Sequence, residues 1–349
     1  MILNDSCCQL PSWLGGSGTT GAVIMASRVR LARNLHGFRF AAKASLQERK
    51  TIFETVADAC RRLPRCRRWT VSNFLTIGPL ARQMLVEERV ASGELERGEG
   101  DRGVIYSLRR GASIMVNEED HIRLCVMGAG DGVRHLWEYA DAVDAALGKK
   151  LPFAFDRTRG FLTSCPTNAG TGLRVSFLMH LPGLALTRTV DQVMQGASQT
   201  GFSVRGFFGE HSEIVGNLFQ VSNQGTLGVS EIDCVDSTRT MVERMVALEA
   251  TARERVLREA RTELSDKIGR SYGILTHAGT LTVAEYLNLA SALRLGIDVG
   301  LFKEVTLETL SRLTIAVMPA HMQTLLGEQA DERELGVMRA QLVRQGLGG

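Results

Sequence analysis

The chain has 349 residues, of which 44% are hydrophobic and 23% charged, proportions typical of a water-soluble globular protein with one or two domains. Apolar runs such as Val175 to Leu181 are too short to cross a membrane, and Met1 to Gly18 does not resemble a secretory signal. A net charge of +3 is too small to indicate nucleic-acid binding, and the seven cysteines form neither a disulfide framework nor a zinc pattern, so we expect a cytoplasmic protein.

Residues 22–35 begin apolar and then carry arginines at positions 28, 30 and 33. Arg28 and Arg30 are two residues apart, so an extended chain points both side chains to one face. Two guanidinium groups on one face repel each other unless an anion lies between them. A solvated strand edge and a phosphate clamp fit this pattern equally well.

The next segments give helix and loop signals. Residues 45–63 have helical spacing and begin with a capping box, and Pro79 opens a second helix that we expect to run to about Ser92. Residues 92–102 are polar and rich in Gly and Glu, which predicts a mobile loop.

Residues 104–116 predict a hairpin that leads into residues 117–123, Asn-Glu-Glu-Asp-His-Ile-Arg. Three successive carboxylates would repel one another in a core, so we expect them to face water, a metal or cationic partners. A strand over residues 121–127 and an amphipathic helix over residues 131–147 follow.

Residues 165–174, Cys-Pro-Thr-Asn-Ala-Gly-Thr-Gly-Leu-Arg, predict a turn between strands over residues 160–164 and 173–181. The turn displays a thiol, an amide, a hydroxyl and a guanidinium. Gly170 and Gly172 permit a positive φ or the close approach of a ligand. An anion-binding turn and a tight connection with an incidental cysteine fit the residues equally well.

The rest of the chain predicts a helix over residues 187–200 and strands over residues 202–208 and 217–222. From Ser230 onward strand signals stop and helical spacing dominates.

The chemistry-bearing residues comprise five arginines, two carboxylates at loop tips and one thiol: Arg28, Arg30, Arg123, Arg174, Arg205, Glu119, Glu210 and Cys165. This collection suits phosphoryl transfer, because that reaction depends on positioning and on charge stabilisation around an anionic group. The sequence has no GxxxxGK[ST] P-loop and no HRD or DFG motif. Side chains would therefore have to hold a nucleotide.

Four segments resemble, in order, the hallmarks of the phosphagen (guanidino) kinases, the ATP:guanido phosphotransferase family. They are Ser27 to Arg30, Asn117 to Arg123, Cys165 to Thr171 and Arg205 to Glu210. The resemblance implies an α+β catalytic domain of glutamine-synthetase-like fold, with a mainly antiparallel sheet flanked by helices.

Further segments resemble the bacterial protein arginine kinases of this family, the McsB group. They are residues 160–168, 179–182, 216–224 and 294–298. The Ser-Arg-x-Arg motif begins at Ser27, which leaves no room for the helical domain that precedes it in kinases of small guanidines. An open acceptor site of this kind suits an arginine side chain on a protein.

This resemblance divides the chain into three parts. We expect an N-terminal segment over residues 1–20, a phosphagen-kinase-like phosphotransferase domain over residues 21–235 and a C-terminal helical domain over residues 236–349.

The resemblance also implies which residues bind ATP. The five arginines would grip the phosphates through charge-assisted hydrogen bonds. Their neighbours complete the implied nucleotide-binding set: Ser27, Val29, Leu31, Val175, Ser176, Phe177, Leu178, Gly206, Phe207, Phe208, Gly209 and Glu210. Mg²⁺ would bridge phosphate oxygens and be held mainly by ATP and water.

Glu119 and Glu210 match the carboxylates that hold the acceptor guanidinium. The pKa of a guanidinium group lies far above neutral pH, so that group is a cation and no nucleophile, and one carboxylate would take a proton as the N–P bond forms. Cys165 matches the family's reactive cysteine, whose thiolate would favour the cationic acceptor; covalent catalysis is the less favoured role.

Three positions depart from the family pattern. Ala169 replaces a larger aliphatic residue, and Arg89 replaces a histidine, which puts a nucleotide contact of Arg89 in doubt. Residues 333–340 keep only Arg339 and Ala340 of a C-terminal Arg-Asp-x-x-Arg-Ala motif that binds phosphoarginine, so that regulatory site is not assigned.

Four histidines have no paired ligand spacing and are predicted to be structural: His121, His135, His180 and His211.

The leading hypothesis is a protein arginine kinase that marks proteins for Clp-type degradation in a stress response. Two alternatives stay open: a phosphagen kinase for small guanidines, and a catalytically silent module that binds arginine or phosphoarginine. The resemblance further implies a zinc-binding McsA-like activator, a Clp protease and support for a homodimer. We expect no nucleic-acid or membrane partner.

Overall fold

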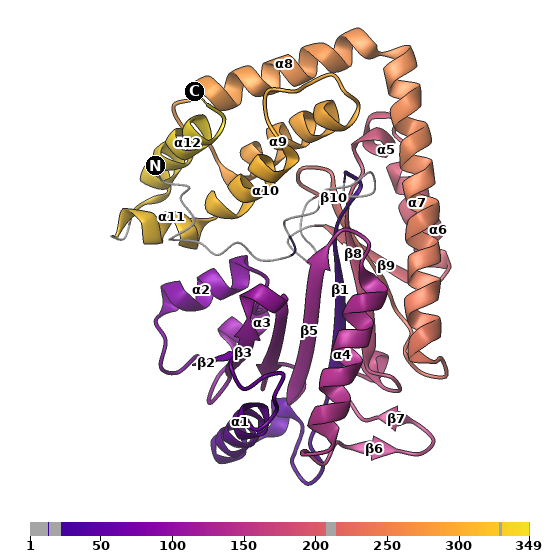
Figure 1. Cartoon of the computed structure of the whole chain (residues 1–349), viewed down its shortest axis with the longest axis vertical. Helices are drawn as coiled ribbons and strands as arrows, with labels where there is room; N and C mark the ends of the chain where they lie inside the picture. The colour runs from indigo at the N-terminus through magenta and orange to yellow at the C-terminus, as the bar shows by residue number, and fades with distance from the viewer. Residues whose placement is uncertain (1–12, 14–21, 207–213, 328–329, 349) are drawn as a thin grey trace.

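The computed structural model describes residue 13 and residues 22–206, 214–327 and 330–348, with an antiparallel sheet at the centre (Figure 1). Within these residues eight strands lie in the order β2-β3-β4-β5-β1-β8-β10-β9, and every neighbouring pair is antiparallel. In that order the strands are Thr70–Asn73, Gly103–Ser107, Ala112–Val116, Ile122–Ala129, Ile24–Arg33, Leu173–His180, Leu218–Asn223 and Phe202–Gly206. The predicted α+β class with a mainly antiparallel sheet is confirmed.

Strand β1 lies in the middle of the sheet, between β5 and β8. Its register sets Arg30 opposite Cys125 of β5 and Arg174 of β8. Directly opposite residues of antiparallel strands point to the same face. We call the face that carries Arg28, Arg30 and their opposite residues the open face, and the other the covered face.

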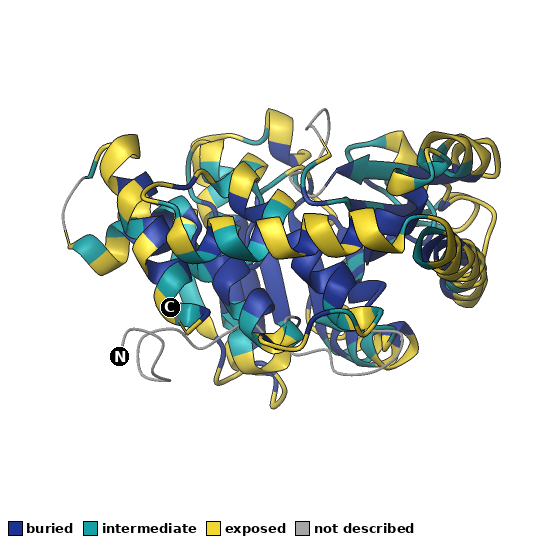
Figure 2. Cartoon of the chain, turned by 90° about the horizontal axis from the view of Figure 1, so that it is seen from above, coloured by how far each residue is buried: buried dark blue, intermediate teal, exposed yellow. Residues whose placement is uncertain are grey.

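Helices α1 (Leu46–Arg61), α4 (Val133–Gly148), α6 (Val190–Gln199) and α7 (Glu231–Glu259) pack on the covered face. Their apolar sides and Ile24, Val29 and Leu31 of β1 belong to one buried cluster, in which Val29 and Leu31 have no exposed surface. Figure 2 shows these buried residues between the sheet and the helices, whose outer sides are exposed. Helix α1 begins as predicted, because Ser45 and Glu48 form a capping box.

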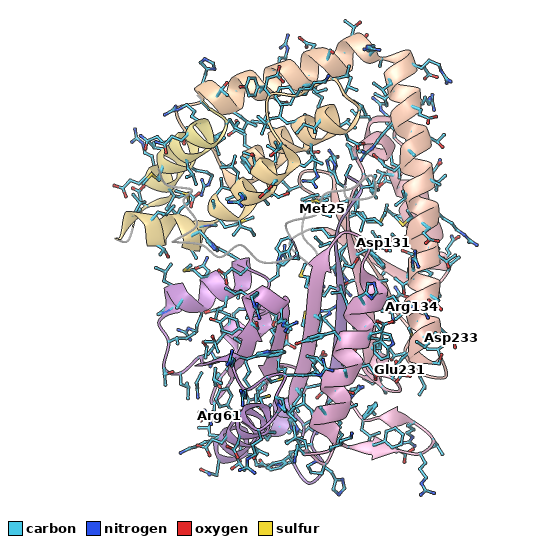
Figure 3. The ribbon with its side chains drawn as sticks, in the orientation of Figure 1. Met25, Arg61, Asp131, Arg134, Glu231 and Asp233 are labelled. Atoms are coloured by element: carbon cyan, nitrogen blue, oxygen red, sulfur yellow. The ribbon has the colours of Figure 1, made fainter. Side chains whose placement is uncertain are left out.

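Ion pairs join α4 and α7 along the edge of the covered face. Asp131 and Arg134, labelled in Figure 3, lie beside α7. Arg134 Nη1 is 3.7 Å from Asp236 Oδ1, and Asp131 Oδ2 is 3.8 Å from Arg239 Nη2. These pairs are largely solvated, so they contribute only about 0–1 kcal/mol each. The apolar cluster beneath them holds the helices in place.

The segment after β2 differs from its prediction. Helix α2 (Pro79–Glu87) ends earlier than expected, and Arg89 takes a left-handed conformation with a φ of 63°. The predicted loop over residues 92–102 is wrong for its first half, since Ser92 caps the short helix α3 (Gly93–Arg97) and accepts from the Leu95 N–H at 3.1 Å.

Short elements connect the rest of the sheet. The strand predicted over residues 160–164 is reduced to β7 (Gly160–Phe161), which pairs with β6 (Phe155–Asp156). Helices α5 (Pro182–Leu186) and α6 (Val190–Gln199) link β8 to β9.

The C-terminal region is helical, as predicted, and lies above the sheet in Figure 1. After α7 come α8 to α12, at Arg261–His277, Val283–Asp298, Leu307–Ala316, Pro319–Leu326 and Glu332–Gly346. They form a second buried cluster, which also includes residues of the sheet such as Ala26, Met127 and Leu178. Residues 235 and 236 lie inside α7, and the domain division stays a prediction. Among the helices described, none is long and apolar enough to span a bilayer.

Candidate active site

The open face gathers the five predicted arginines. Arg28 and Arg30 stand on β1, and Arg174 lies opposite Arg30. Arg205 reaches the same face, because it lies opposite Gln220, which in turn lies opposite Leu178. Arg123 lies opposite Ala32 of β1. Strand register therefore brings together residues from four strands that are far apart in sequence.

Neutral groups bind the guanidinium groups of Arg28 and Arg174. Arg28 donates to Gln220 Oε1 at 2.8 Å and to Ser176 Oγ at 3.2 Å. Arg174 donates to Ser222 Oγ at 3.1 Å and 3.2 Å. Nε of Arg30 is buried and, within the described residues, has no hydrogen-bond partner.

The crowded cations disfavour their own charge. Burial lowers the pKa of Arg28 to about 10; Cys125 opposes this shift, and Arg89, Arg174 and Arg123 act in the same direction as burial. Burial also lowers the pKa of Arg30 well below its ordinary value, with added repulsion from Arg28 and Arg123. A bound anion would relieve both effects, so the charge of this face suits a phosphate group.

Glu118, Glu119 and Asp120, which we call the acidic wall, lie just before β5 at one end of the open face. Arg123 lies between two carboxylates, with Nη1 at 2.5 Å from Glu118 Oε2 and Nη2 at 2.7 Å from Glu119 Oε2. Burial lowers the pKa of Arg123, but Glu118 and Glu119 outweigh it and raise the pKa. The Glu118 side chain is 1% exposed and that of Glu119 is 42% exposed. Glu119 is therefore the carboxylate of this pair that an incoming cation can reach.

Buried polar contacts fix the acidic wall to the cysteine turn. Asp120, with no exposed surface, accepts from Asn34 Nδ2 at 2.6 Å and from the Ser164 N–H at 2.7 Å. Asn168 Nδ2 is 3.4 Å from Glu119 Oε2. Asp120 thus supports the geometry of the wall and the turn.

The cysteine turn is a 3-10 turn, Pro166–Asn168, held by Thr226. Thr226 Oγ1 donates to the carbonyl oxygens of Thr167 and Ala169 at 2.8 Å and 2.7 Å. Sγ of Cys165 is 3.0 Å from Thr167 Oγ1. Gly170 has a φ of 101°, and a Cβ there would lie 2.3 Å from the Thr226 carbonyl oxygen. Glycine is required by close packing of the turn on its own chain.

Two open hollows adjoin the arginines. One, of about 300 Å³, is lined by Arg28, Ser176 and Gln220 together with the apolar Met127 and Leu178. The second hollow lies beside it, next to residues 87–89 at the end of helix α2, which we call the α2 corner. Arg89 and Met127 line both hollows. A polar rim of arginines around an apolar floor suits a nucleotide, which has anionic and aromatic parts.

Several residues of the implied nucleotide set do not face the site. Val29, Leu31, Val175 and Phe177 are fully buried on the covered face, and Ser27 is also buried there and donates to the Gly130 carbonyl oxygen. Their side chains support the strands and cannot contact a ligand on the open face. Ser176 and Leu178 do line the hollow. Gly206 ends β9, and Phe207, Phe208, Gly209 and Glu210 lie outside the described residues.

Sequence reasoning missed Gln220, Ser222 and Met127, which hold the arginines or line the hollow. Alternation of polar and apolar residues along β10 could have indicated the first two. His121 and His180 are buried and structural, as predicted: His121 bonds the Leu35 N–H and the Arg39 carbonyl, and His180 bonds Ser291.

Mg²⁺ is implied by the expected chemistry of ATP. Within the described ranges no three His, Cys, Asp or Glu side chains are grouped to hold a metal ion. The carboxylates of the acidic wall are already bonded to Arg123, Asn34 and Ser164. This arrangement fits a Mg²⁺ that is bound chiefly by phosphate oxygens and water.

Comparison with known proteins agrees with this geometry. Residues 51–252 match the family of the ATP:guanido phosphotransferase C-terminal catalytic domain, and residues 261–349 match the protein-arginine kinase McsB C-terminal domain. The protein-arginine kinase of Moorella thermoacetica is 38% identical over 97% of both chains. That of Bacillus subtilis is 36% identical over 97% of this chain and 93% of its own.

Solved structures of small-guanidine kinases share the fold. A lombricine kinase superposes with a TM-score of 0.60 at 22% identity, covering 69% of each chain. The duplicated taurocyamine kinase from Schistosoma mansoni, with bound transition-state analogue components, gives a TM-score of 0.61 at 25% identity, covering 79% of this chain and 40% of its own. The chain belongs to the ATP:guanido phosphotransferase family, and within it to the protein-arginine kinases.

Proposed function

We propose that the chain transfers the γ-phosphoryl group of ATP to the guanidinium group of arginine side chains in proteins. One observation carries the proposal: Arg28 and Arg30 lack carboxylate partners among the described residues, and beside them Glu119 binds a guanidinium group, that of Arg123. A phosphate site and a guanidinium site thus share one face. Family membership at 36–38% identity to named protein-arginine kinases supports the protein substrate.

The arginines would act on the phosphates. The transferred group is loosely bonded in the transition state and its charge is spread over three oxygens, so fixed cations around it lower the barrier. Arg28 and Arg30 are already held in place by strand β1 and its neighbours. The adenine ring would lie in the hollow over Met127 and Leu178, with Arg89 at its edge.

Glu119 would handle the acceptor. Its carboxylate orients the incoming guanidinium, takes one of its protons as the N–P bond forms, and the bond from the γ-phosphorus to ADP breaks. Arg123 must leave Glu119 to admit the acceptor, and Glu118 retains it at 2.5 Å. Arg123 can then turn its released Nη2 toward the phosphates. Glu210 is the proposed second carboxylate.

Cys165 would line the acceptor pocket beside Glu119. Asn168, three residues further along the turn, already contacts Glu119. A thiolate there would favour a cationic acceptor without forming a bond to phosphorus. Mg²⁺, bound together with ATP, would supply positive charge that neutralises the phosphates.

The finer biological assignments are also proposals. The family resemblance supports a cytoplasmic enzyme with a zinc-binding McsA-like activator, a homodimeric state and delivery of phosphorylated proteins to a Clp-type protease. The proposed division between residues 235 and 236 would separate a phosphotransferase domain from a C-terminal helical domain.

The test is mass spectrometry of an unfolded protein incubated with the full chain, ATP and Mg²⁺. We expect acid-labile phosphoarginine in the protein, and a loss of about 10²–10⁴-fold in rate for Glu119→Gln. Glu138→Gln, which changes an exposed carboxylate on α4, is the matched control. Faster phosphorylation of free arginine than of protein would instead identify a small-guanidine kinase. Nucleotide binding without any turnover would indicate a silent binding module.

A further inference from the structure

A buried ionic contact links the C-terminal helices to the edge of the open face. Glu87, the last residue of α2, accepts from the Ala320 N–H at 2.8 Å and from the His321 N–H at 3.2 Å. These are the first turn of α11, whose N–H groups have no partner within the helix. The same carboxylate lies 2.7 Å from His321 Nδ1. One side chain of the kinase part therefore caps a C-terminal helix and binds its histidine.

His321 has carboxylates at both ring nitrogens. The residue is 3% exposed, and its Nε2 lies 3.8 Å from Glu88 Oε1. Burial lowers the pKa of His321, but hydrogen bonds and charge from Glu87 and Glu88 outweigh it and raise the pKa to about 9. The contact is thus a charged clamp that fixes two consecutive residues of the chain.

The next residue along the chain is Arg89, which lines both hollows. Its backbone has a φ of 63°, an uncommon conformation for a residue with a side chain, so neighbouring contacts must fix it. The clamp on Glu87 and Glu88 does so from one side, and Trp13 Nε1 donates to the Glu88 carbonyl oxygen at 3.2 Å from another. The charge of Arg89 also lowers the pKa of Arg28, so the two guanidinium groups repel each other.

A second observation connects the same two regions. The apolar residues of the Arg28 hollow, Ala26, Met127 and Leu178, belong to the buried cluster that forms the core of the C-terminal helices. The apolar floor of the hollow and the clamp formed by Glu87, Glu88 and His321 therefore both contact the C-terminal helices.

We propose that His321 is a positioning residue for the nucleotide: through Glu87 and Glu88 it holds the Arg89 corner against the open face, so that the C-terminal helices set the affinity for ATP. This inference rests on the proposed function of the open face. His321 contacts no reacting group; its effect passes through the α2 corner.

The experiment compares the full-length wild type with His321→Gln by calorimetric ATP binding and by steady-state kinetics. We expect a 5- to 20-fold rise in the Kd and KM for ATP, with kcat changed less than 2-fold and the KM for the protein substrate unchanged. His277→Gln, an exposed histidine on α8, is the matched control. Glu87→Gln keeps acceptor and shape, should raise KM in the same direction, and serves if His321→Gln is poorly folded.

A double-mutant cycle with Arg89→Met separates positioning from simple stability. If His321 acts through Arg89, the two substitutions together raise the Kd for ATP little more than Arg89→Met alone. Additive effects, or an unchanged Kd with a lower melting temperature, overturn the inference and leave the proposed function intact. A wild-type chain that binds no ATP overturns both.

The pH profile gives an independent readout. Because the folded pKa of His321 is raised, its contribution is fully present below about pH 6.5 and is lost as pH rises through about 9. The charged groups that face it are Glu87 and Glu88, with Arg339 of α12 in electrostatic range of Glu87. The Kd of the wild type should approach that of His321→Gln as the pH rises past 9; a constant ratio between them contradicts the clamp.

Discussion

The two faces of the central sheet carry arginine in opposite electrostatic settings. On the covered face Arg33 is 2% exposed and meets Asp144 of α4 at 2.8 Å, while its Nη1 donates to the carbonyl oxygens of Ala32 and Thr171. On the open face the side-chain partners of Arg28, within the part of the chain that the structure describes, are an amide and a hydroxyl. The residues stand five positions apart on one strand, β1.

The difference teaches how to separate a structural arginine from a ligand-binding one. A buried guanidinium needs a counter-charge, and the cost of leaving it unpaired is several kcal/mol. Among the described residues, the fold supplies a carboxylate to Arg33 and none within ion-pair distance to the half-buried Arg28 and Arg30. We infer that a ligand supplies their counter-charge, and the following substitutions test that difference from the largest expected effect to the smallest.

The largest effect is expected for Arg28→Met. Removing one fixed cation from the phosphate site should lower kcat/KM for ATP by about 10³-fold or more, as for other arginines that stabilise phosphoryl transfer. Phosphoarginine formation at varied ATP measures it. Arg62→Met, which removes an exposed arginine paired with Asp58, is the control and should leave the rate unchanged. A rate within 10-fold of wild type for Arg28→Met would remove Arg28 from the site.

Asp144→Ala should act on stability. It leaves Arg33 buried without its counter-charge, which should lower the free energy of unfolding by about 3–5 kcal/mol. Urea denaturation measures the loss. The double variant Arg33→Met/Asp144→Leu replaces both charges with apolar groups and should recover most of it. If the single variant were as stable as wild type, the contrast between the two faces would be wrong.

Much of this contrast could be predicted from the sequence. The spacing of Arg28 and Arg30 placed both on one strand face, and the Ser45 capping box located α1. The four family motifs pointed to the segments that the fold brings together. Local patterns suffice here because strand alternation and helix capping depend on residues close in sequence.

Other features could not be predicted, because they depend on contacts between distant segments. The partners Gln220 and Ser222 require the register of β10 on β8. The left-handed Arg89 gives no compositional signal; backbone hydrogen bonds at the end of α2 support it locally, and the contacts of the neighbouring Glu87 with α11 come from more than two hundred residues away. The Gly- and Glu-rich composition of residues 92–102 indicated a loop where the short helix at residues 93–97 lies, although Ser92 is a good cap. Nor did spacing alone show that Val29 and Leu31 belong to the core.

The two faces should also differ in the direction in which loss of a charge changes stability. Arg28→Met, inactive by the first prediction, should be more stable than wild type by about 1–2 kcal/mol. The pKa of Arg28 is lowered to about 10, so the fold disfavours its charged form at every pH below that value. Urea denaturation without nucleotide measures the gain. With saturating ATP the wild type should become the more stable of the two proteins. If Arg28→Met were less stable than wild type without nucleotide, the fold would need this charge.

The smallest effect is expected for Ser45→Ala, which alters only the covered side. Ser45 Oγ accepts from the Glu48 N–H at 3.2 Å, and Glu48 in turn bonds the Ser45 N–H at 2.8 Å. Loss of the cap should lower the free energy of unfolding by about 1 kcal/mol. Helix α1 packs on the covered face and touches no arginine of the open face, so kcat and the KM for ATP should stay at wild-type values. Thr51→Ala, further along α1, removes a hydroxyl without a cap and serves as the control. A change in KM for Ser45→Ala would show that the covered face transmits strain through β1 to the phosphate site.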